Sequence, residues 1–148
     1  MEHGNAVLLL LTSIQGIRLM RRWAVLFALV IILLVVLADT GHLGLLSRVY
    51  DFPYGDKVGH FVLFGLLSLL VNLAVFEARP QADLRQLAIW TSLALALLIG
   101  LEEYSQRWFS SRHSSLQDLA ASYAGVIVFA WLAMLIANRK RNPPEPIE

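Results

Sequence analysis

Four long apolar runs divide the chain and predict its secondary structure. A helix that crosses the hydrocarbon core of a bilayer, about 30 Å thick, needs roughly 20 mostly apolar residues. The second and fourth runs meet this length unaided, whereas the first and third need flanking residues to complete a crossing. None of the four contains Asp, Glu, Lys or Arg: residues 23–37, 58–76, 87–101 and 119–137. The pattern predicts an all-α membrane protein, a bundle of four transmembrane helices.

Composition supports a membrane protein and excludes several functional classes. Of 148 residues, 57% are hydrophobic and 16% are charged, which is more apolar side chain than a soluble domain of this length hides. The net charge of +1 includes no basic cluster of the kind that nucleic acid requires, so no nucleic-acid partner is expected. The sequence contains no cysteine, which excludes disulfides, thiolate metal sites and cysteine nucleophiles. No cofactor is expected.

The distribution of Lys and Arg predicts the orientation, because cytoplasmic loops keep the excess of positive charge. With four crossings, eight of these residues share the side of the two termini: Arg18, Arg21, Arg22, Arg79, Arg85, Arg139, Lys140 and Arg141. The other side has four: Arg48, Lys57, Arg107 and Arg112. Both termini are therefore expected in the cytoplasm of a multi-pass protein of the bacterial inner membrane.

The chain divides into three predicted segments. Residues 1–19 form an amino-terminal extension whose apolar run, Ala6 to Leu11, is too short to cross, and Met20 before two arginines is an alternative start. Residues 20–138 form the transmembrane domain. Its first run ends in small residues that imitate a signal-peptide cleavage site, but we expect a retained anchor. Residues 139–148, rich in proline, are expected to form a flexible cytoplasmic tail.

The first group of polar residues opens the second apolar run as Asp56-Lys57-x-x-His60-Phe61. Asp56 and His60 are four residues apart and therefore share one face of a helix, and Lys57 is three residues from His60. An acidic residue near a helix amino terminus also meets the favourable end of the helix dipole.

The second group closes the third run with two adjacent carboxylates, Glu102 and Glu103. Small residues at every fourth position, ending at Gly100, mark the packed face of this helix. At roughly 100° per residue, Glu103 lies about 60° from Gly100 and Glu102 lies nearly opposite. We therefore expect Glu103 to point inward, with Gln106 on the same side as a hydrogen-bond partner.

The third group is Arg112-x-x-Ser115-x-x-Asp118-x-x-x-Ser122-x-x-Gly125, at the start of the fourth run. Ser115 or the serine before it is expected to cap the helix, with Asp118 as a capping-box-like partner. Arg112 has a planar guanidinium group, whose paired N–H donors suit a carboxylate or a phosphate. With the predicted topology, all three groups lie on the extracytoplasmic side.

These three motifs, in this order on successive helices, resemble the VanZ-like family of bacterial membrane proteins. The resemblance covers about Asp56 to Gly125. It implies an all-helical membrane domain and, from the founding member, a link to low-level resistance to the glycopeptide teicoplanin. It implies no particular reaction. The chain departs from the pattern at Ser122, where the family usually has asparagine, so a role that needs a carboxamide there is doubtful.

Three interpretations of the polar cluster remain open. In the first, the substrate-binding residues Asp56, Lys57, Gln106, Arg112 and Ser115 line a shallow pocket that binds the anionic headgroup of a membrane lipid or lipid-linked envelope precursor. In the second, the protein is an enzyme in which the catalytic residues are His60, as general acid or base, and Glu103 or Asp118, which orient it.

In the third interpretation, the same residues form only a structural staple between helix ends, because ionised groups near hydrocarbon are costly and pair for that reason alone. A zinc site is a weaker alternative. Its ligands would come from His42, His60, His113, Glu103 and Asp118. The sequence has no HExxH-like spacing, so no metal site is predicted. The oligomeric state is not predicted.

Overall fold

A computed structural model describes residues 2–40, 54–108 and 115–142 of the chain. It contains four α-helices, of which the third continues into a short 3-10 turn, η3. In chain order they are α1 (Glu2–Asp39), α2 (Gly55–Ala78), α3 (Leu84–Ser105), η3 (Gln106–Trp108) and α4 (Leu116–Arg141). The described part of the chain has no strand, which confirms the all-α prediction.

Three of these helices are long and apolar enough to cross a membrane. They are α2, α3 together with η3, and α4, of 24, 25 and 26 residues. They correspond to the second, third and fourth apolar runs. Their outward faces carry large apolar side chains in contact with the surroundings, including Trp90 at 71% exposure and Ile127 at 67%. Such faces suit lipid rather than water.

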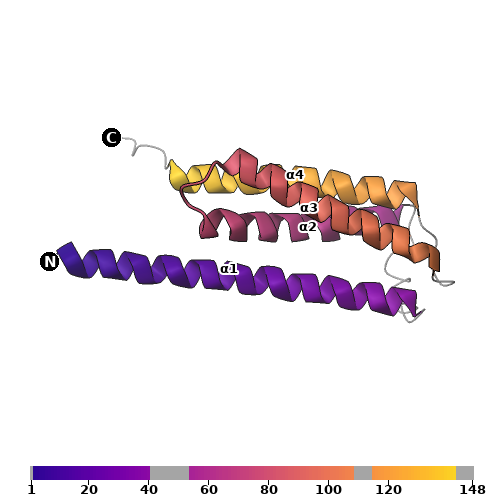
Figure 1. Cartoon of the computed structure of the whole chain (residues 1–148), viewed down its shortest axis with the longest axis horizontal. Helices are drawn as coiled ribbons and strands as arrows, with labels where there is room; N and C mark the ends of the chain where they lie inside the picture. Colours follow the sequence, from indigo (N-terminus) through magenta and orange to yellow (C-terminus); the bar gives the residue numbers. More distant parts are fainter. Residues whose placement is uncertain (1, 41–53, 109–114, 143–148) are drawn as a thin grey trace.

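The first helix is longer than the sequence pattern predicts. The apolar run 23–37 lies within α1, which begins at Glu2 and includes the segment that we expected to be a separate extension. At about 1.5 Å per residue, its 38 residues extend over roughly 57 Å, well beyond a hydrocarbon core. Figure 1 shows α1 extending past the other helices at the end where the chain begins.

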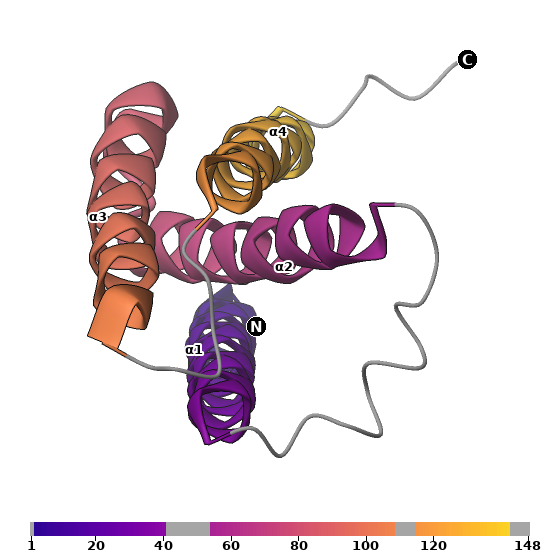
Figure 2. The same ribbon diagram turned by 90° about the vertical axis from the view of Figure 1, so that its right-hand side faces the viewer.

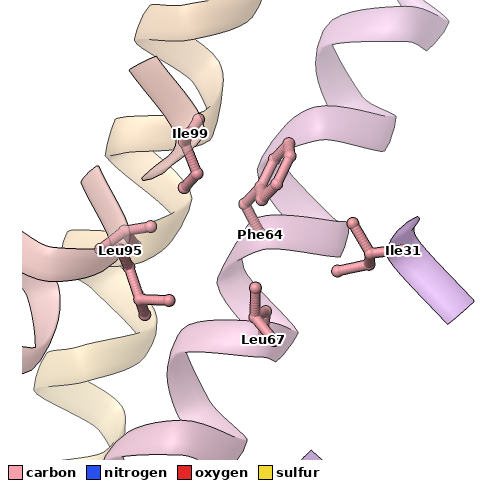
Figure 3. Packing of buried hydrophobic residues seen from close by; sticks show 6 residues of the cluster. Ile31, Phe64, Leu67, Leu95 and Ile99 are labelled. Atoms are coloured by element: carbon pink, nitrogen blue, oxygen red, sulfur yellow. The ribbon is translucent and has the colours of Figure 1, made fainter. Parts of the chain in front are cut away.

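Helix α2 lies at the centre of the bundle. Viewed along the long axis it lies between α1 and α4, with α3 at its side (Figure 2). The main core cluster joins Ile31 of α1 to Phe64 and Leu67 of α2, and these to Leu95 and Ile99 of α3 (Figure 3). Each helix therefore buries part of its apolar surface against α2.

The closest helix contact joins α2 and α4. A Cβ atom on Gly125 would overlap the backbone carbonyl of Phe61, and one on Gly65 would overlap the ring of Phe129. The Ser68 hydroxyl, fully buried, donates a hydrogen bond to the Val126 carbonyl at 2.9 Å. The small residues of this interface thus serve packing within the chain.

Candidate functional site

The three polar groups of the sequence lie at one end of the bundle. The start of α2, the end of α3 and the start of α4 occupy the same end, and the start of α1 and the end of α4 lie at the opposite one (Figure 1). Seven of the eight predicted site residues fall on described helices or at their caps. The eighth, Arg112, lies outside the described residues.

Glu103 is the most buried charged residue of the site, with 5% of its surface exposed. Its Oε1 atom accepts a hydrogen bond from the backbone N–H of Ser115, 2.5 Å away, and its Oε2 atom accepts one from Gln106 Nε2 at 3.2 Å. The prediction that Glu103 rather than Glu102 faces inward is confirmed, as is its contact with Gln106. The same amide also donates to Glu102 Oε1 at 3.0 Å.

Ser115 caps α4, as the sequence predicts. Its backbone is extended, and its Oγ atom accepts a hydrogen bond from the backbone N–H of Asp118 at 3.4 Å. In a capping box the third residue of the helix returns the bond to the cap N–H. Here Glu103 accepts that N–H instead. A carboxylate of α3 therefore completes the amino-terminal cap of α4.

The Asp118 carboxylate faces Lys57. Lys57 Nζ lies 3.2 Å from Asp118 Oδ1 and 2.8 Å from Asp56 Oδ2, so one ammonium group joins the starts of α2 and α4. Asp118 Oδ1 is shielded from solvent and accepts no hydrogen bond of good geometry from the residues that the structure describes. The ion pair is nevertheless short enough for strong attraction, so Lys57 is the group that neutralises this buried oxygen.

His60 is oriented by a backbone carbonyl. Its Nδ1 atom lies 2.8 Å from the Asp56 carbonyl oxygen, which accepts only from a protonated Nδ1. Neutral His60 therefore has its acceptor at Nε2. The ring also lies against Phe64, with centroids 6.0 Å apart.

His60 does not form the direct polar contact with Glu103 or Asp118 that the enzyme interpretation requires. Among described residues, His60 has neither a hydrogen bond nor an ion pair with either carboxylate. The reason is competition: Glu103 is engaged by the Ser115 N–H and Asp118 by Lys57. The three residues belong to one end of the bundle but not to one hydrogen-bonded triad.

Two features of the site were not anticipated. Lys57 was grouped with His60 because of their spacing, whereas it reaches Asp118 across the helix interface. Tyr54, directly before α2, has a left-handed backbone with φ 65° and an exposed side chain. The sequence analysis did not identify this turn, because a left-handed backbone is expected mainly at glycine and Tyr54 is not one.

The described residues contain no group of three or more His, Asp or Glu side chains arranged to hold a metal ion. His42 and His113, which belong to the zinc alternative, lie outside the described residues. No model of a known protein family matches the chain, and no curated protein or solved structure is similar to it.

Proposed function

We propose that this chain is a VanZ-like protein of the bacterial inner membrane that binds the headgroup of an envelope lipid or lipid-linked cell-wall precursor. In this proposal four helices cross the bilayer, both termini are cytoplasmic and the polar cluster faces outward. A link to glycopeptide resistance, through teicoplanin, is part of the proposal. The observation that carries it is the orientation of His60 by the Asp56 carbonyl, with an Nε2 atom that has no hydrogen-bond partner among the described residues.

The rest of the cluster acts as a rigid frame for this ring. Glu103 fixes Ser115, and Lys57 fixes Asp118, so α2, α3 and α4 are held together at their ends. Such a frame reduces the entropy that is lost when a ligand binds. It also explains why several polar side chains are tolerated close to a hydrocarbon layer.

The chemistry of the remaining groups favours a headgroup that carries both phosphate and hydroxyl or amine groups. His60 Nε2 accepts a hydrogen bond when neutral and donates one to phosphate when protonated. The Asp56 side chain is 55% exposed and can accept hydrogen bonds from hydroxyl or ammonium groups. Arg112 is proposed to hold the phosphate through its guanidinium fork.

Retention of a defined lipid by the purified protein tests this proposal. A short-chain polyprenyl phosphate would be added in detergent and bound lipid measured by native mass spectrometry. Losing a hydrogen bond to a charged group should lower affinity about tenfold or more in Arg112→Ala and His60→Ala. Arg107→Ala is the matched control, because Arg107 is not part of the proposed site. Its guanidinium group lies over the Tyr104 ring, 4.8 Å from the ring centroid. Unchanged retention in Arg112→Ala contradicts the proposal.

Two alternatives retain specific support. The fixed tautomer of His60 suits a general base, and only turnover of a defined headgroup would establish an enzyme. The bond from Glu103 to Ser115 suits a structural staple. Single substitutions of His60, Glu103 and Asp118 distinguish a functional site from a structural staple when folding and cellular phenotype are measured together. If every loss of phenotype follows a loss of folded protein, the staple is sufficient.

The number of crossings is tested by labelling single cysteines, which the absence of native cysteine makes straightforward. With four crossings, a membrane-impermeant maleimide should label Tyr54→Cys in intact cells. Gln81→Cys and Gly16→Cys should react only after the membrane is permeabilised. Labelling of Gly16→Cys from outside would mean that α1 does not cross.

A further inference from the structure

At the end of the bundle opposite the candidate site, the last turn of α4 contacts the turn that joins α2 to α3. Arg141 Nη1 donates a hydrogen bond to the Ala82 carbonyl at 3.0 Å, and Lys140 Nζ lies 3.3 Å from Glu77 Oε1. These contacts hold the basic end of α4 beside the turn that joins α2 to α3. They also engage the charges of Lys140, Arg141 and Glu77 within the protein.

Three arginines that flank this junction of α2, α3 and α4 make no such contacts with other described residues. Arg79, Arg85 and Arg139 are exposed, and their guanidinium groups make no hydrogen bond or ion pair within the described ranges. We name these three residues the basic rim. They come from the end of α2, the start of α3 and the end of α4, which the contacts above bring to one end of the bundle.

No free carboxylate in the described part of the chain balances the basic rim locally. Residues 77–86 and 137–142 contain five cationic side chains and two acidic ones. Glu77 is paired with Lys140, and Asp83 caps α3 by accepting the Gln86 N–H at 2.7 Å. Within the described residues, this end of the bundle therefore has an excess of positive charge.

The rim also borders the apolar outer face of the bundle. Ile89 and Trp90, about one turn after Arg85, are 48% and 71% exposed, and Leu135, one turn before Arg139, is 39% exposed. A ligand at this border would meet guanidinium groups at its polar end and aromatic and aliphatic side chains along its apolar part. A membrane phospholipid has this arrangement, whereas a free anion does not.

We propose that the basic rim binds the phosphate groups of anionic phospholipids in the adjoining leaflet. Guanidinium groups bind phosphate through paired hydrogen bonds, and juxtamembrane cations are attracted to anionic leaflets. This site is separate from the headgroup site proposed above, because it lies at the other end of the bundle. It requires no assumption about His60 or Arg112.

The test compares retention of phosphatidylglycerol and phosphatidylcholine with identical acyl chains by the full chain in detergent, using native mass spectrometry. Arg85→Gln should lower phosphatidylglycerol retention about fivefold, and Arg79→Gln/Arg85→Gln/Arg139→Gln should lower it further and reduce the preference over phosphatidylcholine. Arg107→Gln, which removes one exposed charge at the other end, is the matched control. Arg85→Lys should retain most of the preference, because the charge remains.

Three outcomes overturn the proposal. One is an unchanged preference in the triple variant whose helix content, measured by circular dichroism, equals that of the original chain. Another is an equal loss in Arg107→Gln and Arg85→Gln, which would show that the attraction follows total charge rather than the rim. The last is equal retention of both lipids by the unsubstituted chain.

Discussion

The carboxylate of Glu103, at the end of α3, accepts the backbone N–H of Ser115, the residue that caps α4. The first N–H groups of a helix have no partner within the helix, and a buried one is costly when unpaired. Glu103 therefore links two helices through a main-chain atom, so the identity of the Ser115 side chain does not affect this bond. The negative charge also lies at the positive end of the α4 dipole.

Replacing Glu103 should destabilise the junction of α3 and α4. In Glu103→Ala the Ser115 N–H and the Gln106 amide lose an acceptor, and we expect a loss of about 1–3 kcal/mol in the free energy of unfolding. Glu103→Gln keeps one carbonyl oxygen and should lose less. Unfolding in mixed detergent, followed by circular dichroism, measures both. Equal stability of Glu103→Ala and the unsubstituted chain would show that the bond contributes nothing.

Removing the Ser115 hydroxyl should have a smaller and separate effect. Ser115→Ala removes the acceptor of the Asp118 N–H but leaves the backbone N–H that Glu103 binds, so a loss of about 1 kcal/mol is expected. Ser115→Thr preserves a capping oxygen and serves as the control. The same unfolding measurement applies. A loss in Ser115→Thr as large as that in Ser115→Ala would contradict a capping role.

The two partners of the ion pair between α2 and α4 should respond unequally to substitution. Lys57→Met leaves the Asp118 carboxylate, 14% exposed, without its cation, whereas Asp118→Asn leaves Lys57 beside Asp56. We expect Lys57→Met to cost about 1–3 kcal/mol and Asp118→Asn less. The double variant should recover part of the loss in Lys57→Met. Additive losses would show that the two side chains do not interact.

Hydrophobic pattern and spacing predict much of this fold because they depend on local geometry. The three apolar runs after residue 57 became helices of spanning length. The angle between Glu103 and Gly100 predicts that Glu103 points inward, and the spacing of Ser115 and Asp118 predicts that Ser115 caps α4. Each prediction needed only the periodicity of one helix, which sequence alone determines.

Contacts between helices were harder to predict, because several partners compete for each polar group. Lys57 has His60 three residues away on its own helix, but Asp118 on α4 offers the stronger attraction of an opposite charge. Asp118 was expected to complete its own cap, but Glu103 supplies a better placed acceptor. The length of α1 was missed for another reason: polar residues near its start broke the apolar pattern but did not end the helix.

The polar stripe within α2 gives a further prediction. Ser68 donates to the Val126 carbonyl across the interface, whereas Asn72 donates to Ser68 and, among the described residues, its buried Oδ1 has no hydrogen-bond partner. Ser68→Ala should therefore cost about 0.6 kcal/mol, typical of hydrogen bonds between membrane helices. Asn72→Leu should be close to neutral, because an unpaired polar atom is removed. A larger loss in Asn72→Leu than in Ser68→Ala, measured by unfolding in detergent, would refute this assignment.

The closest approach of α2 and α4 should make Gly125 the least tolerant of the buried glycines. A methyl group in Gly125→Ala would meet the Phe61 backbone carbonyl, which can move only if the helices separate, so a loss of about 1–3 kcal/mol is expected. Gly65→Ala would meet the Phe129 ring instead. Replacing Phe129 by the smaller leucine removes this overlap, so Gly65→Ala/Phe129→Leu should be more stable than Gly65→Ala alone.

Gly16, in α1, is the matched control, because no atom of the described part of the chain lies within 4 Å of a Cβ atom placed there. Gly16→Ala should change stability by less than about 0.5 kcal/mol, or increase it slightly through better helix propensity. Phe129→Leu should not restore the stability of Gly125→Ala in the same way, because the added methyl group meets backbone atoms there. If Phe129→Leu restored Gly125→Ala, or if Gly125→Ala were as harmless as Gly16→Ala, the two helices would not be packed backbone to backbone at this point.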